Sequence, residues 1–506
     1  MAIENFVSHS APFGEALPIG NPHAVSASLP RLDDVRRLFR DHDAEAWASL
    51  QTTYPRFGDH PFIRQAAELC PINEGRSLVA FSSPQAAERL VDSVGPKEIV
   101  EPTILVDGTM TFLSFTPGTA ETADLVKVAK KVGGGVPSSR RAEDFLIDQG
   151  ILATPYEEVI DPEGTDVAVR QELQRIYDPL KPEVFLANSG MSAISAAIDA
   201  LHYIRNRGQG TEETGRGVWV MLGNLYRDSE DLVIRRHEAR KVKDVTDVAK
   251  IREMVEGQGE RIAGLITEAP ANPLLQSPDL EEVKAALGDI PLVVDVSTGG
   301  SIAVDAFPHA DVVVESLTKF ASGRGDLMMG AVIVNPDSRY ADELHAALPA
   351  RIEPPYHRDV ARFSHELKDW YERAWRTGVN VLHLAEFFEG HPRIKAVHWA
   401  GSEKNDDGYA RLARNNIEYP GLITVETKRA LRPVYDALDL AKGPSFGTRF
   451  TLNTDFTGIV YPQEIRERDS ASMLERRTGL TPRMLRVSVG TEDPDWLIDR
   501  YKEALS

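Results

Sequence analysis

Short apolar runs and helical stretches alternate along the middle of the chain. The runs are rich in β-branched residues and do not alternate with polar positions; they cover residues 103–106, 184–187, 218–222, 262–267, 292–295, 311–315 and 329–334. Helical stretches separate several of them, at residues 189–205, 242–256 and 279–287. A strand without alternation is buried on both faces, which is typical of a parallel sheet between two layers of helices. The pattern therefore predicts an α/β fold with a large, mostly parallel sheet.

The two ends of the chain do not show this alternation of strands and helices. Residues 1–55 contain several prolines, which predict an irregular arm with one short helix within residues 32–50. From about residue 355 a helical stretch at 358–390 precedes strand-like runs at 421–427 and 450–452 and a last helix near 495–505. These changes predict an N-terminal extension, a large α/β domain and a smaller C-terminal α+β domain, at residues 1–95, 96–355 and 356–506.

Composition and charge narrow the class of protein. The 506 residues are 42% hydrophobic and 26% charged, as in an ordinary soluble globular protein. The net charge of −20 argues against nucleic acid or an anionic membrane surface as a partner, because both need clustered Lys and Arg. Cys70 is the only cysteine, which excludes an internal disulfide and a cysteine-rich metal site and fits a reducing compartment.

The sequence also predicts a cytoplasmic location. No apolar run approaches the roughly 20 residues of a membrane-spanning helix. The first ten residues contain Glu4 and neither Lys nor Arg, and no apolar segment follows them. A secretory signal is therefore not expected.

Three stretches carry residues that suit a chemical site. Asp295 ends an apolar strand, where ligands of open α/β sheets bind, although such an aspartate also caps turns or helices. Lys319 follows the next apolar run, between hydroxyl residues and Gly323, although a lysine at a strand end is often only solvated. The stretch 184–192 reads as strand, glycine turn and helix start, which suits either an anion or a simple helix cap.

The three stretches together suggest more than each does alone. Pyridoxal 5'-phosphate needs a lysine for its aldehyde, an aspartate that keeps its pyridine nitrogen protonated, and backbone amides and hydroxyls for its phosphate. Lys319, Asp295 and the glycine turn at Gly190 supply these groups. The sequence therefore indicates a pyridoxal-phosphate site and no metal site.

At this point the chain resembles the Cys/Met-metabolism family of fold-type I pyridoxal-phosphate enzymes. The resemblance rests on Asn188-Ser-Gly-Met-Ser-Ala-Ile194, Glu268-Ala-Pro-Ala-Asn272-Pro-Leu-Leu275, the run 310–319, Leu384-Ala-Glu-Phe-Phe-Glu-Gly-His-Pro392 and Arg486-Val-Ser-Val-Gly-Thr-Glu-Asp493. Within the family the chain is most similar to the longer, fungal-type cystathionine γ-synthases. Their N-terminal pattern is echoed by residues 22–30, Tyr54-Pro-Arg-Phe57 and Ser138-Ser-Arg-Arg-Ala-Glu143.

The resemblance implies a seven-stranded sheet in the large domain and roles for named residues. Lys319 would hold the cofactor aldehyde and carry protons, and Asp295 would pair with the pyridine nitrogen. Other positions implied to contact the cofactor are Gly190, Met191, Ser316 and Thr318 at the phosphate, Tyr226 on the ring, Asn272 at the phenolic oxygen, and Ser297. Arg486, assisted by Ser445, would bind the substrate carboxylate, and Arg140 would reach the phosphate of a neighbouring subunit.

Two positions depart from the family pattern. Ser138 stands where many members have a tyrosine two residues before the arginine, so a phenol donated across a dimer interface is expected to be missing. Arg324 stands where a histidine is common. Both suggest a substrate pocket that differs from that of a housekeeping enzyme.

The implied reaction is γ-substitution on an amino acid with a leaving group on Cγ. The first hypothesis is a cystathionine γ-synthase-like reaction of an activated homoserine with cysteine. Open alternatives are another donor, such as S-adenosylmethionine, with a carbon or amine nucleophile, a γ-lyase, and a non-catalytic scaffold on the same fold. The expected partners are a small amino-acid substrate, a nucleophilic co-substrate and further copies of the chain, as a homodimer or homotetramer with shared active sites.

Overall fold

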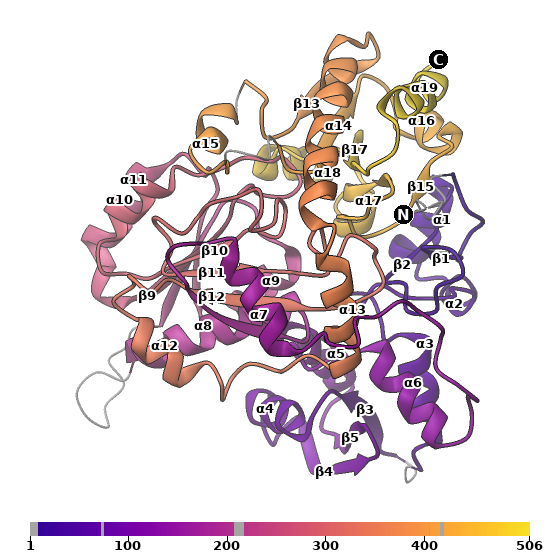
Figure 1. Ribbon diagram of the computed structural model, residues 1–506, viewed down its shortest axis with the longest axis vertical. Helices are drawn as coiled ribbons and strands as arrows, with labels where there is room; N and C mark the ends of the chain where they lie inside the picture. The colour runs from indigo at the N-terminus through magenta and orange to yellow at the C-terminus, as the bar shows by residue number, and fades with distance from the viewer. Residues whose placement is uncertain (1–8, 72–74, 207–216, 404, 415–418) are drawn as a thin grey trace.

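The fold is described from a computed structural model that covers the chain apart from residues 1–8, 72–74, 207–216, 404 and 415–418 (Figure 1). Most of the segment on which the expectation of no secretory signal rests therefore lies outside the described residues. Within them, no helix is both long and apolar enough to cross a membrane.

A seven-stranded sheet forms the centre of the molecule, with strand order β6-β12-β11-β10-β9-β7-β8. Its strands are β6 (Glu183–Ala187), β7 (Val218–Leu222), β8 (Glu238–Val242), β9 (Ile262–Glu268), β10 (Leu292–Asp295), β11 (Val312–Glu315) and β12 (Gly330–Val334). Only β12 runs antiparallel to its neighbours. The predicted α/β fold with a large, mostly parallel sheet is confirmed.

Helices cover both faces of this sheet because both faces are apolar. Successive strand residues alternate between two clusters: Val294 packs on one side and Val293 on the other. The first cluster includes α7 (Asp166–Arg175), α10 (Val248–Gln258), α11 (Leu280–Leu287) and α13 (His357–Leu367). The second includes α8 (Gly190–Asn206), α9 (Arg227–Arg236) and α12 (Ala341–Ala347). Burial on two sides explains the unbroken apolar runs in the sequence.

Two details of the predicted sheet were wrong. Edge strand β8 was missed, because its sequence Glu-Ala-Arg-Lys-Val is mostly charged and mostly solvent-facing. Residues 103–106, expected in the large sheet, belong instead to β4 (Ile99–Asp107) of a separate antiparallel sheet, β3-β5-β4, with β3 (Ser77–Phe81) and β5 (Met110–Pro117). An apolar run alone does not say which sheet it joins.

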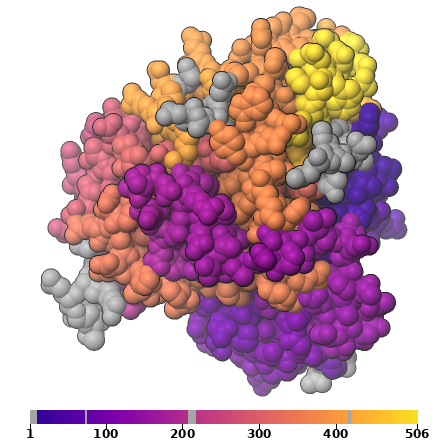
Figure 2. Space-filling model, viewed as in Figure 1, coloured from indigo at the N-terminus to yellow at the C-terminus, as the bar shows by residue number. Residues whose placement is uncertain are grey.

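This small sheet is the core of a separate unit that protrudes at one end of the molecule (Figures 1 and 2). It packs against α4 (Pro84–Val94) and α5 (Thr122–Val132) on one side, and α3 (Pro61–Leu69) and α6 (Ser139–Asp148) on the other. The predicted boundary between residues 95 and 96 falls inside this unit, between α4 and β4.

The C-terminal region is built on a five-stranded sheet of order β13-β14-β17-β16-β15. Its strands are β13 (Ile394–His398), β14 (Leu422–Thr427), β15 (Ala441–Lys442), β16 (Leu452–Thr454) and β17 (Met484–Ser488). The long helix α14 (Trp370–Gly390) starts in the core of the large domain, at Trp370, and ends in the C-terminal core, at Phe388. The remaining helices there are α15 (Asp406–Ala410), α16 (Arg432–Ala437), α17 (Phe456–Val460), α18 (Arg468–Thr478) and α19 (Pro494–Ala504).

The N-terminal arm is not free but packs on the C-terminal domain. It contains β1 (Ala16–Leu17), β2 (Ser26–Ala27), α1 (Leu32–Val35), a π-helical turn at Arg36–Arg40 and α2 (Ala44–Ala48). Apolar side chains such as Val35 and Leu38 share a buried cluster with Leu384 and Tyr435. The arm therefore leads the chain past the C-terminal domain towards the edge of the large sheet.

Candidate active site

A cavity of about 110 Å³ lies at the C-terminal ends of the parallel strands. Such sheet edges are where α/β proteins bind ligands. Its lining combines strand-end residues, the start of α8 and the N-terminal arm, and includes Tyr54, Arg56, Lys131, Ser189, Gly190, Met191, Tyr226, Asp228, Glu268, Asn272, Asp295, Ser297, Ser316, Thr318, Lys319 and Phe446. Nine of the twelve residues that the sequence singled out thus meet around one space.

Three carboxylates end three neighbouring strands at this edge. Glu268, Asp295 and Glu315 are the last residues of β9, β10 and β11, and Asp295 pairs in register with Glu268. All three are buried. Burial raises the pKa of Asp295, and burial together with the Asp295 charge raises the pKa of Glu268 well above its usual value. A cation placed beside Asp295 would relieve this repulsion.

Glu315 lies at the same edge of the sheet but does not line the cavity. It accepts hydrogen bonds from Ser301, and burial raises its pKa from the usual 4.5 to about 7. Between these two pH values the Glu315 carboxyl is ionised in the unfolded chain but protonated in the folded protein. The free energy of unfolding therefore falls as pH rises, by about 1.4 kcal/mol per pH unit. Above pH 7 the total loss in the free energy of unfolding caused by Glu315, relative to low pH, reaches about 3 kcal/mol.

Glu315→Gln is therefore expected to gain stability relative to the unsubstituted protein between pH 5 and pH 8. The difference in free energy of unfolding between the variant and the unsubstituted protein should rise by on the order of 2–3 kcal/mol from pH 5 to pH 8. It is measured by urea unfolding at both pH values. Glu372→Gln, at a side chain that is 62% exposed, is the control and should show no such difference. An equal effect of Glu315→Gln at both pH values would contradict the assignment.

Lys319 lies buried in the loop after β11 and points to the arm. Its Nζ is 2.8 Å from the hydroxyl of Tyr54 and 2.9 Å from the Oγ of Ser445, and it donates to both. Its Nζ also lies over the Tyr54 and Phe446 rings. A single lysine is thus held among hydroxyls and aromatic faces, with no carboxylate paired to it in the part of the chain that the structure describes.

The two tyrosines of the cavity differ in acidity. Burial opposes ionisation of Tyr54, but the adjacent Lys319 charge and the hydrogen bonds with Lys319 and Tyr226 together outweigh it and lower the pKa of the Tyr54 phenol. Burial and the Asp228 charge raise the pKa of Tyr226 well above its usual value, and its hydroxyl lies 3.2 Å from Asp228 Oδ2, to which it donates. Tyr54 is therefore the phenol suited to exchange a proton with Lys319.

The start of α8 forms the end of the cavity that suits a phosphate. Gly190 begins the helix, and a Cβ there would lie 2.6 Å from the Cβ of Ser316, so no larger residue fits. Free N–H groups at a helix start attract anions. Ser316 lines this end, and Ser297 Oγ accepts from its backbone N–H at 2.7 Å. Thr318 also lines the cavity, but Met329 occupies its hydroxyl with two backbone hydrogen bonds.

Arg56 adds a cation to the lining of the cavity. Its Nε lies 3.4 Å from Asp228 Oδ1, and its guanidinium lies 5.4 Å from the centre of the Tyr226 ring. Its carbonyl accepts from Lys131, another cation of the lining. Arg56, Lys131 and the helix start are therefore the groups of the lining that suit a phosphate.

Arg486 lines an adjoining cavity of about 50 Å³ that also reaches Tyr54 and Tyr226. It is buried on β17, donates to Asn272 Oδ1, to the Ser445 carbonyl at 2.5 Å and to Thr454, and its Nε has no protein partner. Burial lowers its pKa to about 10. No salt bridge neutralises it among the described residues, so this arginine is ready for a ligand carboxylate.

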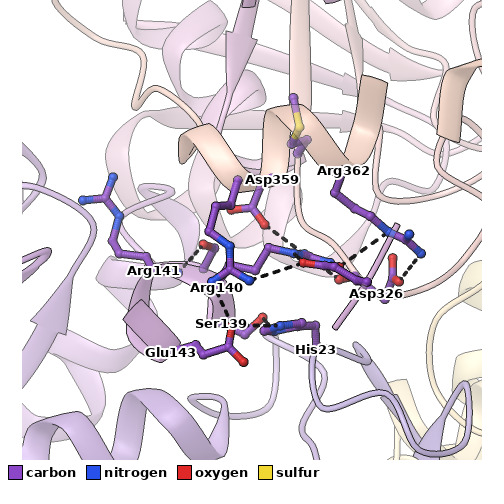
Figure 3. Close-up of polar contacts among 12 residues, drawn as sticks. His23, Ser139, Arg140, Arg141, Glu143, Asp326, Asp359 and Arg362 are labelled. Carbon is purple, nitrogen blue, oxygen red and sulfur yellow. Dashed lines mark hydrogen bonds and ion pairs between the residues drawn. The ribbon is translucent and has the colours of Figure 1, made fainter. Parts of the chain in front are cut away.

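Arg140 does not take the position expected of it. Its side chain is fully buried, bonded to Glu158 at 2.5 Å, to Asp359 at 3.0 Å and to the Asp326 carbonyl at 2.9 Å (Figure 3). A guanidinium enclosed by two carboxylates cannot reach a neighbouring subunit, so the prediction of that role was wrong. The arginine that lines the cavity is Arg56.

The two positions that depart from the family pattern, Ser138 and Arg324, also lie outside the cavity. Ser138 caps α6 and accepts from the Arg141 N–H. Arg324 lies 4.0 Å from Glu366 and lines neither cavity. A phenol does lie beside Lys319, but it is that of Tyr54.

Sequence reasoning gave no role to Tyr54, Arg56, Asp228 or Phe446. A signal for the first two existed, since the stretch Tyr54-Pro-Arg-Phe57 was part of the resemblance. The fold was needed to bring that stretch beside Lys319, which follows it by 265 positions.

Fold and site together define a pyridoxal-phosphate-dependent enzyme. A family model described as Cys/Met metabolism PLP-dependent enzyme matches residues 164–506. A curated relative, the L-2-amino-4-chloropent-4-enoate dechlorinase/desaturase of Streptantibioticus cattleyicolor, is 32% identical over 96% of both chains. This chain belongs to the Cys/Met-metabolism family of pyridoxal-phosphate-dependent enzymes, which confirms the cofactor.

Further relatives include cystathionine γ-synthase-like proteins. The cystathionine gamma-synthase-like protein ankD of Aspergillus thermomutatus is 27% identical over 98% of this chain and 95% of its own. The crystal structure of cystathionine γ-synthase from Xanthomonas oryzae pv. oryzae in complex with cystathionine has a TM-score of 0.55 and 19% identity, over 68% of this chain and 86% of its own. The latter likeness shows the shared fold.

Proposed function

We propose that this enzyme removes or replaces a leaving group on Cγ of an α-amino acid. The observation that carries the proposal is the buried Lys319, which lies between the Tyr54 and Ser445 hydroxyls in a space shared with Asp295 and close to Arg486. Elimination at Cγ requires one group to move protons at Cα and Cβ in turn, and an amine within reach of two hydroxyls is suited to that task.

The residues fit the cofactor and divide the work. Bound pyridoxal phosphate supplies an electron sink for negative charge at Cα. Asp295 holds a proton on the pyridine nitrogen, and the start of α8 with Arg56 holds the phosphate. Arg486 fixes the substrate carboxylate, while Lys319 and Tyr54 move protons at the substrate carbons. The aromatic walls exclude water from the reacting atoms.

Two reactions of this kind deserve separate tests. The name of the Streptantibioticus relative supports loss of a small γ-substituent, such as chloride, without a nucleophile. The adjoining cavity agrees with this, because it is small and mainly apolar, with Phe456, Ile459, Val460 and Leu480 in its lining. The cystathionine γ-synthase-like relatives support replacement, with an activated homoserine and cysteine as substrates.

The experiment is a panel of donors with and without cysteine, followed by product mass. The donors are a γ-chloro amino acid, O-succinyl-, O-acetyl- and O-phosphohomoserine, and S-adenosylmethionine. Halide release without cysteine would support elimination, and a cystathionine mass would support replacement. Turnover only with S-adenosylmethionine would favour a retargeted donor. If no donor loses its γ-group while the cofactor is bound, the proposal is wrong.

Arg486→Lys provides a prediction about substrate binding. Lysine keeps the charge but loses the planar fork that binds a carboxylate with two hydrogen bonds, which costs about 1.5–3 kcal/mol. We expect kcat/KM to fall roughly 10–100-fold, mostly through KM. The control is Arg483→Lys, on the same stretch, where the arginine pairs with Glu426 outside both cavities. Equal effects of the two substitutions would contradict a role in binding substrate.

A further inference from the structure

The N-terminal arm contacts the loop that carries Lys319 at three points. Besides the bond between Tyr54 and Lys319, the Val25 N–H donates to the Gly325 carbonyl at 2.8 Å. Asn21 Nδ2 donates to Asp326 Oδ2 at 2.9 Å, and both groups are buried. The arm and this loop are about 300 positions apart in sequence, so these bonds depend on the path of the arm.

A buried network of polar side chains holds the arm in place near His23 (Figure 3). His23 of the arm lies between Ser139 Oγ, at 3.0 Å, and Glu143, at 3.4 Å, on α6. Arg140 of the same helix bonds Asp359 on α13 and the Asp326 carbonyl. Arm, α6, α13 and the Lys319 loop thus share one set of polar contacts, which explains why Arg140 is buried there.

The segment before Tyr54 is fixed to the C-terminal domain of the chain. The Leu32 N–H donates to Asp436 Oδ1 at 2.8 Å, and the Tyr435 hydroxyl donates to the Leu29 carbonyl at 2.9 Å. Arg432 forms an ion pair with Asp33, with Nη1 and Oδ2 2.7 Å apart. A buried apolar cluster lies beneath these bonds.

The segment after Tyr54 is fixed as well. His60 Nε2 donates to the Pro22 carbonyl at 2.7 Å and closes the arm into a loop. Lys130 of α5 bonds Asp59 at 2.7 Å. Tyr54 and Arg56 therefore lie on a short span of chain that is tied down on both sides, to three parts of the protein.

We propose that the arm completes the active site of its own chain, so that Tyr54 and Arg56 act on the Lys319 and phosphate sites of the same polypeptide. The family resemblance implied active sites shared between subunits, with a cation and a phenol from the neighbour. In this chain both groups come from the arm. The inference rests on the proposed function only for the chemical role of Tyr54. The position of Tyr54 and Arg56, in their own or a neighbouring active site, can be tested without a substrate.

The first test is chemical cross-linking of the arm to the C-terminal domain. In Arg432→Lys, a water-soluble carbodiimide activates the exposed Asp33 carboxylate, and the lysine amine displaces the resulting urea to form an amide. The products are separated on a denaturing gel, and the peptide that joins positions 33 and 432 is located by mass. We expect it in the band of single-chain size. Its presence only in covalent dimers would overturn the proposal, and the unsubstituted protein is the control.

The second test does not depend on cross-linking yield. Lys319→Ala and Tyr54→Phe chains with different tags are co-expressed, and hybrid oligomers are isolated as holoenzyme through both tags. The readout is the pH titration of the visible absorption of the cofactor attached to Lys319. In a hybrid, Lys319 is present only in the Tyr54→Phe chain. We therefore expect the absorption of the cofactor attached to it to titrate as in the pure Tyr54→Phe protein.

The outcomes of the second test separate the possibilities. Titration of the hybrid as in the unsubstituted enzyme would mean that Tyr54 acts on a neighbour, which would overturn the proposal. The same is true if Tyr54→Phe itself leaves the titration unchanged, because Tyr54 then does not act on Lys319. Failure to form any hybrid, with both chains monomeric, would support completion within one chain. Neither test uses a substrate, so an error in the proposed reaction leaves both results unaffected.

Discussion

Lys319→Ala is expected to lower kcat by about 10³-fold or more, because one side chain serves both as the attachment point of the cofactor and as the proton carrier. The visible absorption of the attached cofactor should disappear at the same time. Both effects are measured on purified protein, with the donor that is most active in the panel. The fold should persist, since the Lys319 amine bonds only two hydroxyls at the edge of a cavity.

A small primary amine gives this prediction a second readout. Ethylamine added to Lys319→Ala can enter the space left by the side chain and is expected to restore part of the rate. The same amine should not affect the control Lys368→Ala, where the lost side chain is 60% exposed and paired with Asp161. If Lys319→Ala keeps more than about a tenth of the rate without amine, another group moves the protons.

The sequence was informative about the sheet because its strands are buried on both faces. Runs such as 292–295 and 311–315 are apolar on both faces and therefore stand out in the sequence. Their bounds coincide with those of β10 and, within one residue, of β11. The pattern failed where burial differs. Strand β8 is at the edge and mostly charged, and β4 is apolar but pairs in another sheet. Local pattern reports burial, whereas strand partners depend on the path of the whole chain.

The site residues also differ in how far the sequence alone could indicate them. Asp295 and Gly190 could be placed from the sequence because one ends a strand and the other begins a helix, and Lys319 follows the end of β11 closely. Tyr54 and Arg56 come from an irregular arm whose position depends on bonds to residues hundreds of positions away, such as Asp326 and Asp436. Arg140 was misassigned because its short motif does not reveal the carboxylates that surround it.

Asp295→Asn is the second substitution with a large expected effect. The carboxylate lies buried at the end of β10, beside Glu268, and burial raises its pKa. Its charged form gains most from a cationic partner, and the protonated pyridine nitrogen of the cofactor is such a partner. Asparagine keeps the shape but not the charge, so the nitrogen loses its proton and the ring accepts electrons from Cα less well.

The loss of this charge-assisted hydrogen bond is worth about 3 kcal/mol in a buried site, which corresponds to a roughly 10²-fold lower kcat. Cofactor affinity should fall too, as measured by equilibrium dialysis. Glu315→Gln is the matched control, since it neutralises a buried carboxylate at the end of the adjacent strand β11 that does not line the cavity. It should keep kcat within about twofold, because it leaves the ring nitrogen untouched. Equal losses in both variants would mean that the carboxylates act through stability, whereas a loss confined to Asp295→Asn places the ring nitrogen at β10.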